Sequence, residues 1–193
     1  SIVCPSGHVG IVGMKPTTGR VSRHGIIPIA ITQDTPGPMA RNVADLALLM
    51  RTMDVPDPRD PPTMAAGKKY PIINPTPMAA LSSYRIGVWR NYWGAGSRPE
   101  VDALFDQQVE LMRELGAEMV ELELSTDRVG DLSYQVLLYE FKDGINRYLQ
   151  SVSDPTAPGS LDALITFNRE RADEVMPHFG QDILIAAQAK GDL

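Results

Sequence analysis

The sequence has few of the features that mark several large classes of protein. It contains one cysteine, Cys4, among 193 residues, which excludes an internal disulfide and suits the reducing cytoplasm, where we expect the protein to act. No apolar run approaches the length that crosses a bilayer, so we expect no membrane span. Lys and Arg number 18 against 24 Asp and Glu, and no basic stripe is present, which argues against nucleic acid as a partner.

Recognisable catalytic and cofactor motifs are also scarce. The three histidines, His8, His24 and His178, show no helical i, i+4 pairing and are not accompanied by a cysteine pair, so we expect no metal site. No glycine-rich phosphate or dinucleotide loop is present, and no cofactor is expected. Because the chain lacks a G-x-S-x-G elbow, we interpret His24 and Asp34 as turn residues and not as members of a hydrolytic triad.

The opening stretch, Ser1 to Arg23, is the most informative part of what is present. It reads SIVCPSGHVGIVGMKPTTGRVSR and places glycines and prolines between short β-branched pairs. β-Branched residues favour extended backbone, and each glycine indicates a tight turn or a close approach of two backbones. We therefore expect extended pieces laid against the interior, and no long helix. The apolar fraction of 43% is that of an ordinary globular chain with a core.

The next segments alternate between regular and irregular patterns. Residues 26–31 (IIPIAI) predict an extended segment or a bend, because proline interrupts the apolar run. Arg41 to Met53 has the apolar periodicity of a helix, with Asn42 as its N-cap. Residues 54–77 are rich in proline and predict an extended connection without regular structure. A domain boundary there is the alternative to a long crossover within one domain, which we prefer.

A strand, a helix and a second strand follow with short links. Arg85 to Trp89 and Met119 to Leu124 are the strand candidates, the second with its glutamates on a solvated face. Between them, residues 97–100 (SRPE) have the spacing of a capping box, and the helix they begin ends at Gly116. This order predicts a parallel pair joined by a helical crossover.

The remaining chain is predicted to be helical. Residues 131–152, 160–171 and 182–190 carry apolar faces, and breaks occur at Ser153-Asp154-Pro155 and near residues 178–180. From these patterns alone we expect a protein of the α/β class.

The first 53 residues resemble the amidase signature family of serine hydrolases. The matching text is SIVCPSGHVGIVGMKPTTGRVSRHGIIPI followed by QDTPGPMARNVADLALLM, and the segment SIVCP is most similar to the branch with peptide amidases. The resemblance implies a single partial amidase domain over 1–193. Within it, 1–53 is the signature core, 54–84 the proline-rich crossover and 85–193 the strand-helix-strand and helical segment. It also implies the mixed α/β sheet of that family, covered by helices on both faces.

The same resemblance implies the chemistry and its site. Ser1 corresponds to the nucleophile, which attacks a carboxamide and forms an acyl-enzyme. In the family a second serine in a cis peptide and a lysine activate it, and a glycine-rich loop forms the oxyanion hole. All three precede the nucleophile, so we expect this chain to be a fragment that is inactive alone. Lys15 belongs to the K-P-T turn and does not replace the lysine.

The expected substrate is a small-molecule or peptide amide. Many family members carry arginine two residues after the nucleophile, whereas this chain has Val3, which favours a neutral or apolar acyl group. A homo-oligomer is left open. Two other functions remain as alternatives: a non-catalytic scaffold subunit derived from an amidase, and an N-terminal-nucleophile hydrolase in which the α-amine of Ser1 is the base.

Overall fold

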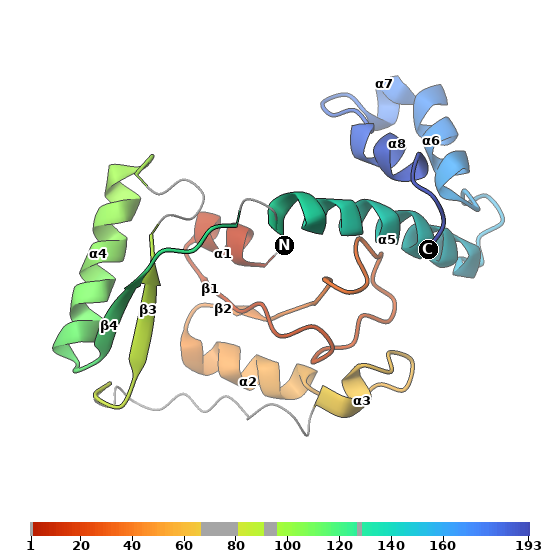
Figure 1. Cartoon of the computed structure of the whole chain (residues 1–193). Coiled ribbons are helices and arrows are strands. Elements are labelled where there is room, and N and C mark those ends of the chain that lie inside the picture. Colours follow the sequence, from red (N-terminus) through yellow and green to blue (C-terminus); the bar gives the residue numbers. More distant parts are fainter. Residues whose placement is uncertain (1, 67–80, 91–95, 127–128) are drawn as a thin grey trace. The chain divides into compact units, whose positions relative to one another are not determined.

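The structure is a computed structural model that describes residues 2–66, 81–90, 96–126 and 129–193 (Figure 1). The chain divides into two compact units, one formed by Ser1–Pro75 with Gly130–Leu193 and the other by Thr76–Val129. Both contain helices together with short strands, so the α/β class predicted from the sequence is confirmed.

The opening of the chain folds into a short helix, α1 (Val3–Val9), followed by strand β1 (Val12–Gly13). The expectation of extended backbone is therefore wrong for Val3–Val9. Proline is tolerated in the first turn of a helix, where its missing N–H has no partner to lose, and Pro5 stands there. The helix ends at Gly10, which adopts φ 68° and donates its N–H to the Ser6 carbonyl. The β-branched residues Val3 and Val9 lie at its two ends.

Strand β1 pairs antiparallel with β2 (Met39–Ala40), with Val12 opposite Ala40. Residues 26–31 between them form turns and irregular backbone, so the predicted bend is confirmed and no strand forms there. Helix α2 (Val43–Met53) follows directly, as predicted.

Helix α2 has the N-cap that its sequence predicts. The Asn42 side-chain oxygen accepts a hydrogen bond of 2.9 Å from the Asp45 backbone N–H. Leu46, Ala47 and Met50 are the buried residues of its apolar face. Spacing and cap agree, which is why this helix is predictable from local sequence.

The proline-rich segment is irregular over its described residues except for one short helix, α3 (Thr63–Ala66). The expectation of no regular element is wrong for these residues. They follow Pro61 and Pro62, contain no proline themselves, and so retain every N–H that a helical turn needs. Residues 67–80, which complete the predicted crossover, lie outside the described part of the chain.

The second unit holds the predicted strand-helix-strand arrangement. Strands β3 (Arg85–Trp89) and β4 (Glu118–Leu122) are parallel, with Arg85 opposite Glu118 and Trp89 opposite Leu122. Helix α4 (Pro99–Glu114) connects them and lies beside them in Figure 1. The β4 glutamates are exposed, as expected from the alternating sequence.

Helix α4 begins at a proline and ends before a glycine, and its N-terminus differs from the prediction. Its N-cap is Arg98 and not Ser97, and the Arg98 side chain makes no capping hydrogen bond, so the predicted N-cap position is wrong by one residue. Pro99 opens the helix instead, at the position where proline is most favourable. Gly116, at φ 97°, follows the C-terminus as predicted. Several large apolar side chains of α4 are solvent-exposed, among them Val101 at 62% and Leu104 at 60%.

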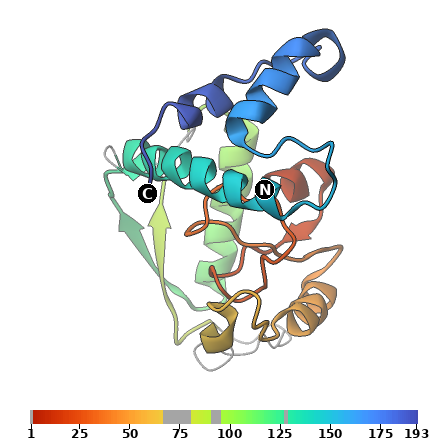
Figure 2. The ribbon, with the colours of Figure 1, turned by 90° about the vertical axis from the view of Figure 1, so that its right-hand side faces the viewer.

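The three predicted C-terminal helices are confirmed. They are α5 (Val129–Ser151), α6 (Leu161–Glu170) and α8 (Asp182–Gln188), and a fourth short helix, α7 (Ala172–Val175), was not predicted (Figures 1 and 2). Ser160 caps α6 by accepting the Ala163 N–H. The core they share consists of Leu138, Ile145, Leu161, Ile165 and Ala187. No helix within the described residues is both long and apolar enough to cross a membrane.

Candidate functional site

The nucleophile candidate from the sequence, Ser1, lies outside the described residues. Its neighbour Ile2 is described and is the N-cap of α1. The backbone around Ile2 is fixed at two points, because its carbonyl accepts both the Ser6 N–H at 3.1 Å and the Ser6 hydroxyl at 2.8 Å. Ser6 itself is 2% exposed. The residue that follows the candidate nucleophile is therefore held by a buried side chain.

Two signature glycines let the backbone pack against Ile2. A β-carbon at Gly37 would lie 2.7 Å from Ile2 Cδ1 and 2.6 Å from Pro16 Cδ, and closer still to the Met14 carbonyl oxygen. A β-carbon at Gly13 would lie 3.3 Å from Ile2 Cγ2 and would overlap the Ser6 side chain. Neither position has room for a side chain larger than that of glycine, as expected where two segments of backbone approach closely.

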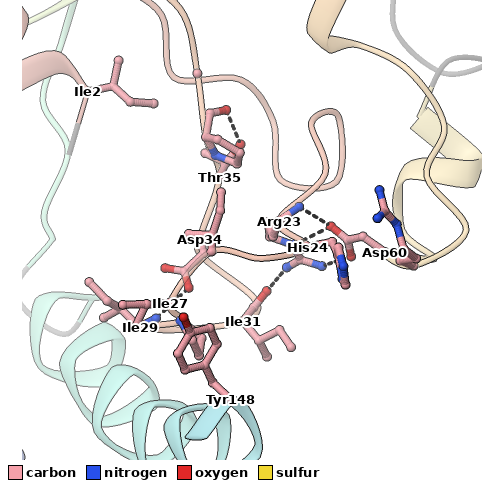
Figure 3. A pocket seen from close by; sticks show the side chains of 15 residues that line it. Ile2, Arg23, His24, Ile27, Ile29, Ile31, Asp34, Thr35, Asp60 and Tyr148 are labelled. Atoms are coloured by element: carbon pink, nitrogen blue, oxygen red, sulfur yellow. Dashed lines mark hydrogen bonds and ion pairs between the residues drawn. The ribbon is translucent and has the colours of Figure 1, made fainter. Parts of the chain in front are cut away.

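Ile2 also lines a pocket of about 530 Å³ (Figure 3). The rest of the lining comes from most of residues 23–37, from Arg59 and Asp60, and from Tyr148 of α5. Four isoleucines of the lining are largely exposed to solvent, between 45% and 59%: Ile26, Ile27, Ile29 and Ile31. Figure 3 shows Tyr148 beside Ile29 and Ile27. The pocket is therefore apolar for most of its surface, and no pattern in the sequence indicates that Tyr148 joins it.

The pocket brings His24 and Asp34 to one lining without forming a catalytic pair. The Asp34 carboxylate accepts the backbone N–H groups of Ile29 at 2.8 Å and Ala30 at 3.0 Å, which closes the turn before it. His24 is exposed and lies in a turn of its own. Their interpretation as turn residues is confirmed.

The first seven residues of the proline-rich segment carry aspartates at positions 54, 57 and 60, and each of them binds a side chain of the GRVSR segment, residues 19–23. The Arg20 Nε donates to the Asp54 carboxylate at 3.0 Å, and the Ser22 hydroxyl donates to Asp57 at 2.7 Å. Three such pairs exist, Arg20–Asp54, Ser22–Asp57 and Arg23–Asp60, and we call them together the carboxylate ladder.

The last pair of the ladder lines the pocket. The Arg23 guanidinium donates to both oxygens of the Asp60 carboxylate, at 2.7 and 2.9 Å, and the Arg23 backbone N–H donates to it at 2.9 Å. The side-chain hydrogen bond from Arg23 holds the pKa of Asp60 below its ordinary value, and the same bond raises the pKa of Arg23. At neutral pH both side chains are therefore charged, and each supplies hydrogen-bond partners for the other.

The other residues considered from the sequence are dispersed. Val3 is 60% exposed on α1, and Lys15 is exposed ahead of a turn. Cys4 is a free, exposed thiol. Within the described residues no cluster of three or more His, Cys, Asp or Glu could hold a metal ion.

Comparison with known proteins identifies the family of the chain. Residues 1–187 match the family model described as Amidase. The chain belongs to the amidase signature family. The match includes the segments that build the pocket, the ladder and the glycine contacts around Ile2.

Solved amidase structures share the fold over the whole chain. The native peptide amidase from Stenotrophomonas maltophilia is 36% identical, with a TM-score of 0.84 over 100% of this chain and 39% of that one. A peptide amidase in complex with the competitive inhibitor chymostatin gives the same values. Among curated relatives, a glutamyl-tRNA(Gln) amidotransferase subunit from Azorhizobium caulinodans is 32% identical over 96% of this chain and 37% of its own length. The chain thus spans less than two fifths of the relatives it matches.

Proposed function

We propose that the chain is part of an amidase that hydrolyses a carboxamide, with Ser1 as the nucleophile. The observation that carries the proposal is the match to the family over residues 1–187. The resemblance of the segment SIVCP to the family sequence assigns the nucleophile to Ser1. The packing of Gly13 and Gly37 on Ile2 supports it, because a nucleophile must be held by rigid surroundings.

The proposed reaction has two steps. The Ser1 Oγ attacks the amide carbonyl carbon, the C–N bond breaks, and the nitrogen leaves as ammonia or an amine after taking up a proton. Water then attacks the resulting ester, releasing the acid and restoring the serine. The resemblance assigns the proton transfers to a lysine and a second serine in a cis peptide, and the oxyanion to a glycine-rich loop. Removing one oxyanion donor alone costs about 2.7–4 kcal/mol of transition-state stabilisation. We therefore expect the 193 residues on their own to hydrolyse no amide above background.

The proposed acyl group is neutral. Val3 stands where many family members have arginine, so no cation is supplied there for a substrate carboxylate. In the pocket beside Ile2, the Arg23 and Arg59 guanidinium groups are paired with Asp60 and Asp57, and the Asp34 carboxylate is occupied by backbone N–H groups. A charged substrate group placed among the exposed isoleucines would lose its hydration without gaining a partner.

The test uses the complete gene product that contains these residues. Ammonia or amine release is measured with a neutral primary amide and with a dicarboxylic half-amide of the same length. We expect turnover of the neutral amide that Ser1→Ala abolishes and that Ser153→Ala, an exposed serine outside the pocket, leaves unchanged. Turnover that survives Ser1→Ala would overturn the assignment of the nucleophile, and a preference for the half-amide would overturn the neutral acyl group.

The curated relatives favour one alternative. They are named as subunits of an amidotransferase, so this chain could serve a multi-subunit assembly, either as a catalytic component or as a scaffold. The two functions differ in their need for a partner. A free amidase hydrolyses its substrate without another protein, whereas a component of an assembly acts only when its partner is bound. Turnover by the purified complete gene product alone would favour the amidase.

A further inference from the structure

We propose that Arg23 is a positioning residue that holds the wall of the pocket beside Ile2. Its guanidinium joins the Asp60 carboxylate of the proline-rich segment to the Ile31 carbonyl of the wall, as Figure 3 shows. The role in substrate binding rests on the proposed function, whereas the role in ordering the wall does not.

The wall, residues 26–31, has little apolar burial to stabilise it. Ile27 is 59% exposed and Ile29 is 51% exposed, and Ala30 is the one buried residue of this segment. A segment that buries so little apolar surface must be ordered by polar contacts or remain mobile. The polar contacts at its C-terminal end are the Arg23 bond to the Ile31 carbonyl, the Asp34 carboxylate bonds to the N–H groups of residues 29 and 30, and the backbone bonds that the Ala30 carbonyl accepts from residues 33 and 34.

Arg23 is itself fixed in both backbone and side chain. One carboxylate, Asp60, receives its backbone N–H and two guanidinium N–H groups, so the guanidinium cannot rotate away without breaking several bonds. The side chain of Asp60 is 8% exposed and that of Arg23 is 14% exposed. The remaining guanidinium nitrogen, Nη1, points at the Ile31 carbonyl. A lysine could pair with Asp60 but offers no planar fork to reach the second acceptor.

The ladder contains a matched control for this geometry. Arg20 and Asp54 form a pair of the same type and similar burial, with side chains 7% and 14% exposed. Neither residue is part of the pocket lining. If ladder pairs only stabilise the fold, Arg20→Lys and Arg23→Lys should act alike. If Arg23 positions the wall, only Arg23→Lys should loosen residues 26–34.

The test measures backbone hydrogen exchange and steady-state kinetics on the complete gene product. For Arg23→Lys we expect exchange in residues 26–34 to accelerate about tenfold, equivalent to about 1.4 kcal/mol of local opening. We also expect KM for a neutral amide to rise by a similar factor while kcat changes less. Asp60→Asn, which keeps the shape of the side chain, should give the same pattern more weakly. Arg20→Lys should leave both the exchange at 26–34 and KM unchanged.

Equal effects of the Arg20 and Arg23 variants, or unchanged exchange at 26–34 in both Arg23→Lys and Asp60→Asn, would overturn the proposal. If Arg23→Lys fails to fold, Asp60→Asn carries the test. An enzyme without amide turnover would refute the proposed function alone, since the exchange measurement decides the positioning role independently.

Discussion

The substitution Gly37→Ala tests whether close backbone packing fixes the segment next to the candidate nucleophile. Gly37 is not among the glycines with positive φ, so an alanine there meets no backbone penalty of its own. The cost is steric. The added methyl would overlap the Met14 carbonyl oxygen and lie 2.7 Å from Ile2 Cδ1. Because the nearest atom belongs to the backbone, no side-chain rotation relieves the overlap.

The magnitude follows from two contributions. Forcing a methyl group into a packed site costs about 1–3 kcal/mol. The backbone shift also strains the neighbouring hydrogen bond from the Met14 N–H to the Pro38 carbonyl, 3.1 Å long, which is worth about 0.5–1.5 kcal/mol. Together they predict a loss of about 1.5–4.5 kcal/mol in the free energy of unfolding. For a protein of this size, each kcal/mol lowers Tm by about 2–4 °C.

Gly7→Ala is the matched control. Gly7 lies inside α1, and a β-carbon there would meet no atom within 4 Å. Alanine is favoured over glycine in a helix by about 0.5–1 kcal/mol, so this variant should be slightly more stable than the wild type. Thermal and urea unfolding, followed by circular dichroism, measure both variants. A Gly37→Ala protein as stable as the wild type would refute the packing argument.

Three further predictions address other parts of the structure. Asn42→Ala removes the N-cap of α2 and should lower the free energy of unfolding by about 1 kcal/mol, whereas Asn42→Ser, which keeps an oxygen acceptor for the Asp45 N–H, should retain most of it, as urea titration would reveal. Asp60 has a lowered pKa when folded, so its contribution is fully present above the ordinary aspartate value of about 3.9 and is lost as pH falls from there through the lower folded pKa. Asp60→Asn should therefore flatten the acid side of the stability profile, and an unchanged profile would contradict the linkage. Val3→Arg should shift turnover from a neutral amide toward a dicarboxylic half-amide, and unchanged selectivity in kcat/KM would count against the role of this position.

Elements with local signals were predictable from the sequence. Helix α2 carries both its apolar spacing and its cap within twelve residues, and the β3–α4–β4 arrangement follows from two short strands separated by one helix. Helix α1 was not predictable in the same way. Its valines favour extended backbone and Gly7 disfavours a helix, but the valines fall at the helix ends and Gly10 supplies the left-handed cap.

The ladder and the pocket depend on pairs that are distant in the sequence. Arg23 and Asp60 are 37 residues apart, and no local periodicity predicts that they meet. The spacing of Asp54, Asp57 and Asp60 in the sequence does not identify their partners. Tyr148 reaches the pocket from α5 for the same reason, because tertiary packing and not local pattern decides which face of a helix meets the signature segment.

The central claim is that Ser1 carries the acyl group, and trapping the acyl-enzyme tests it most directly. The complete gene product is treated with a fluorophosphonate that labels activated serines, then digested and analysed by mass spectrometry. We predict one adduct, on the peptide that contains Ser1, and none in the Ser1→Ala variant. An adduct on another serine, or an unlabelled Ser1 in a protein that turns over amides, would contradict the claim.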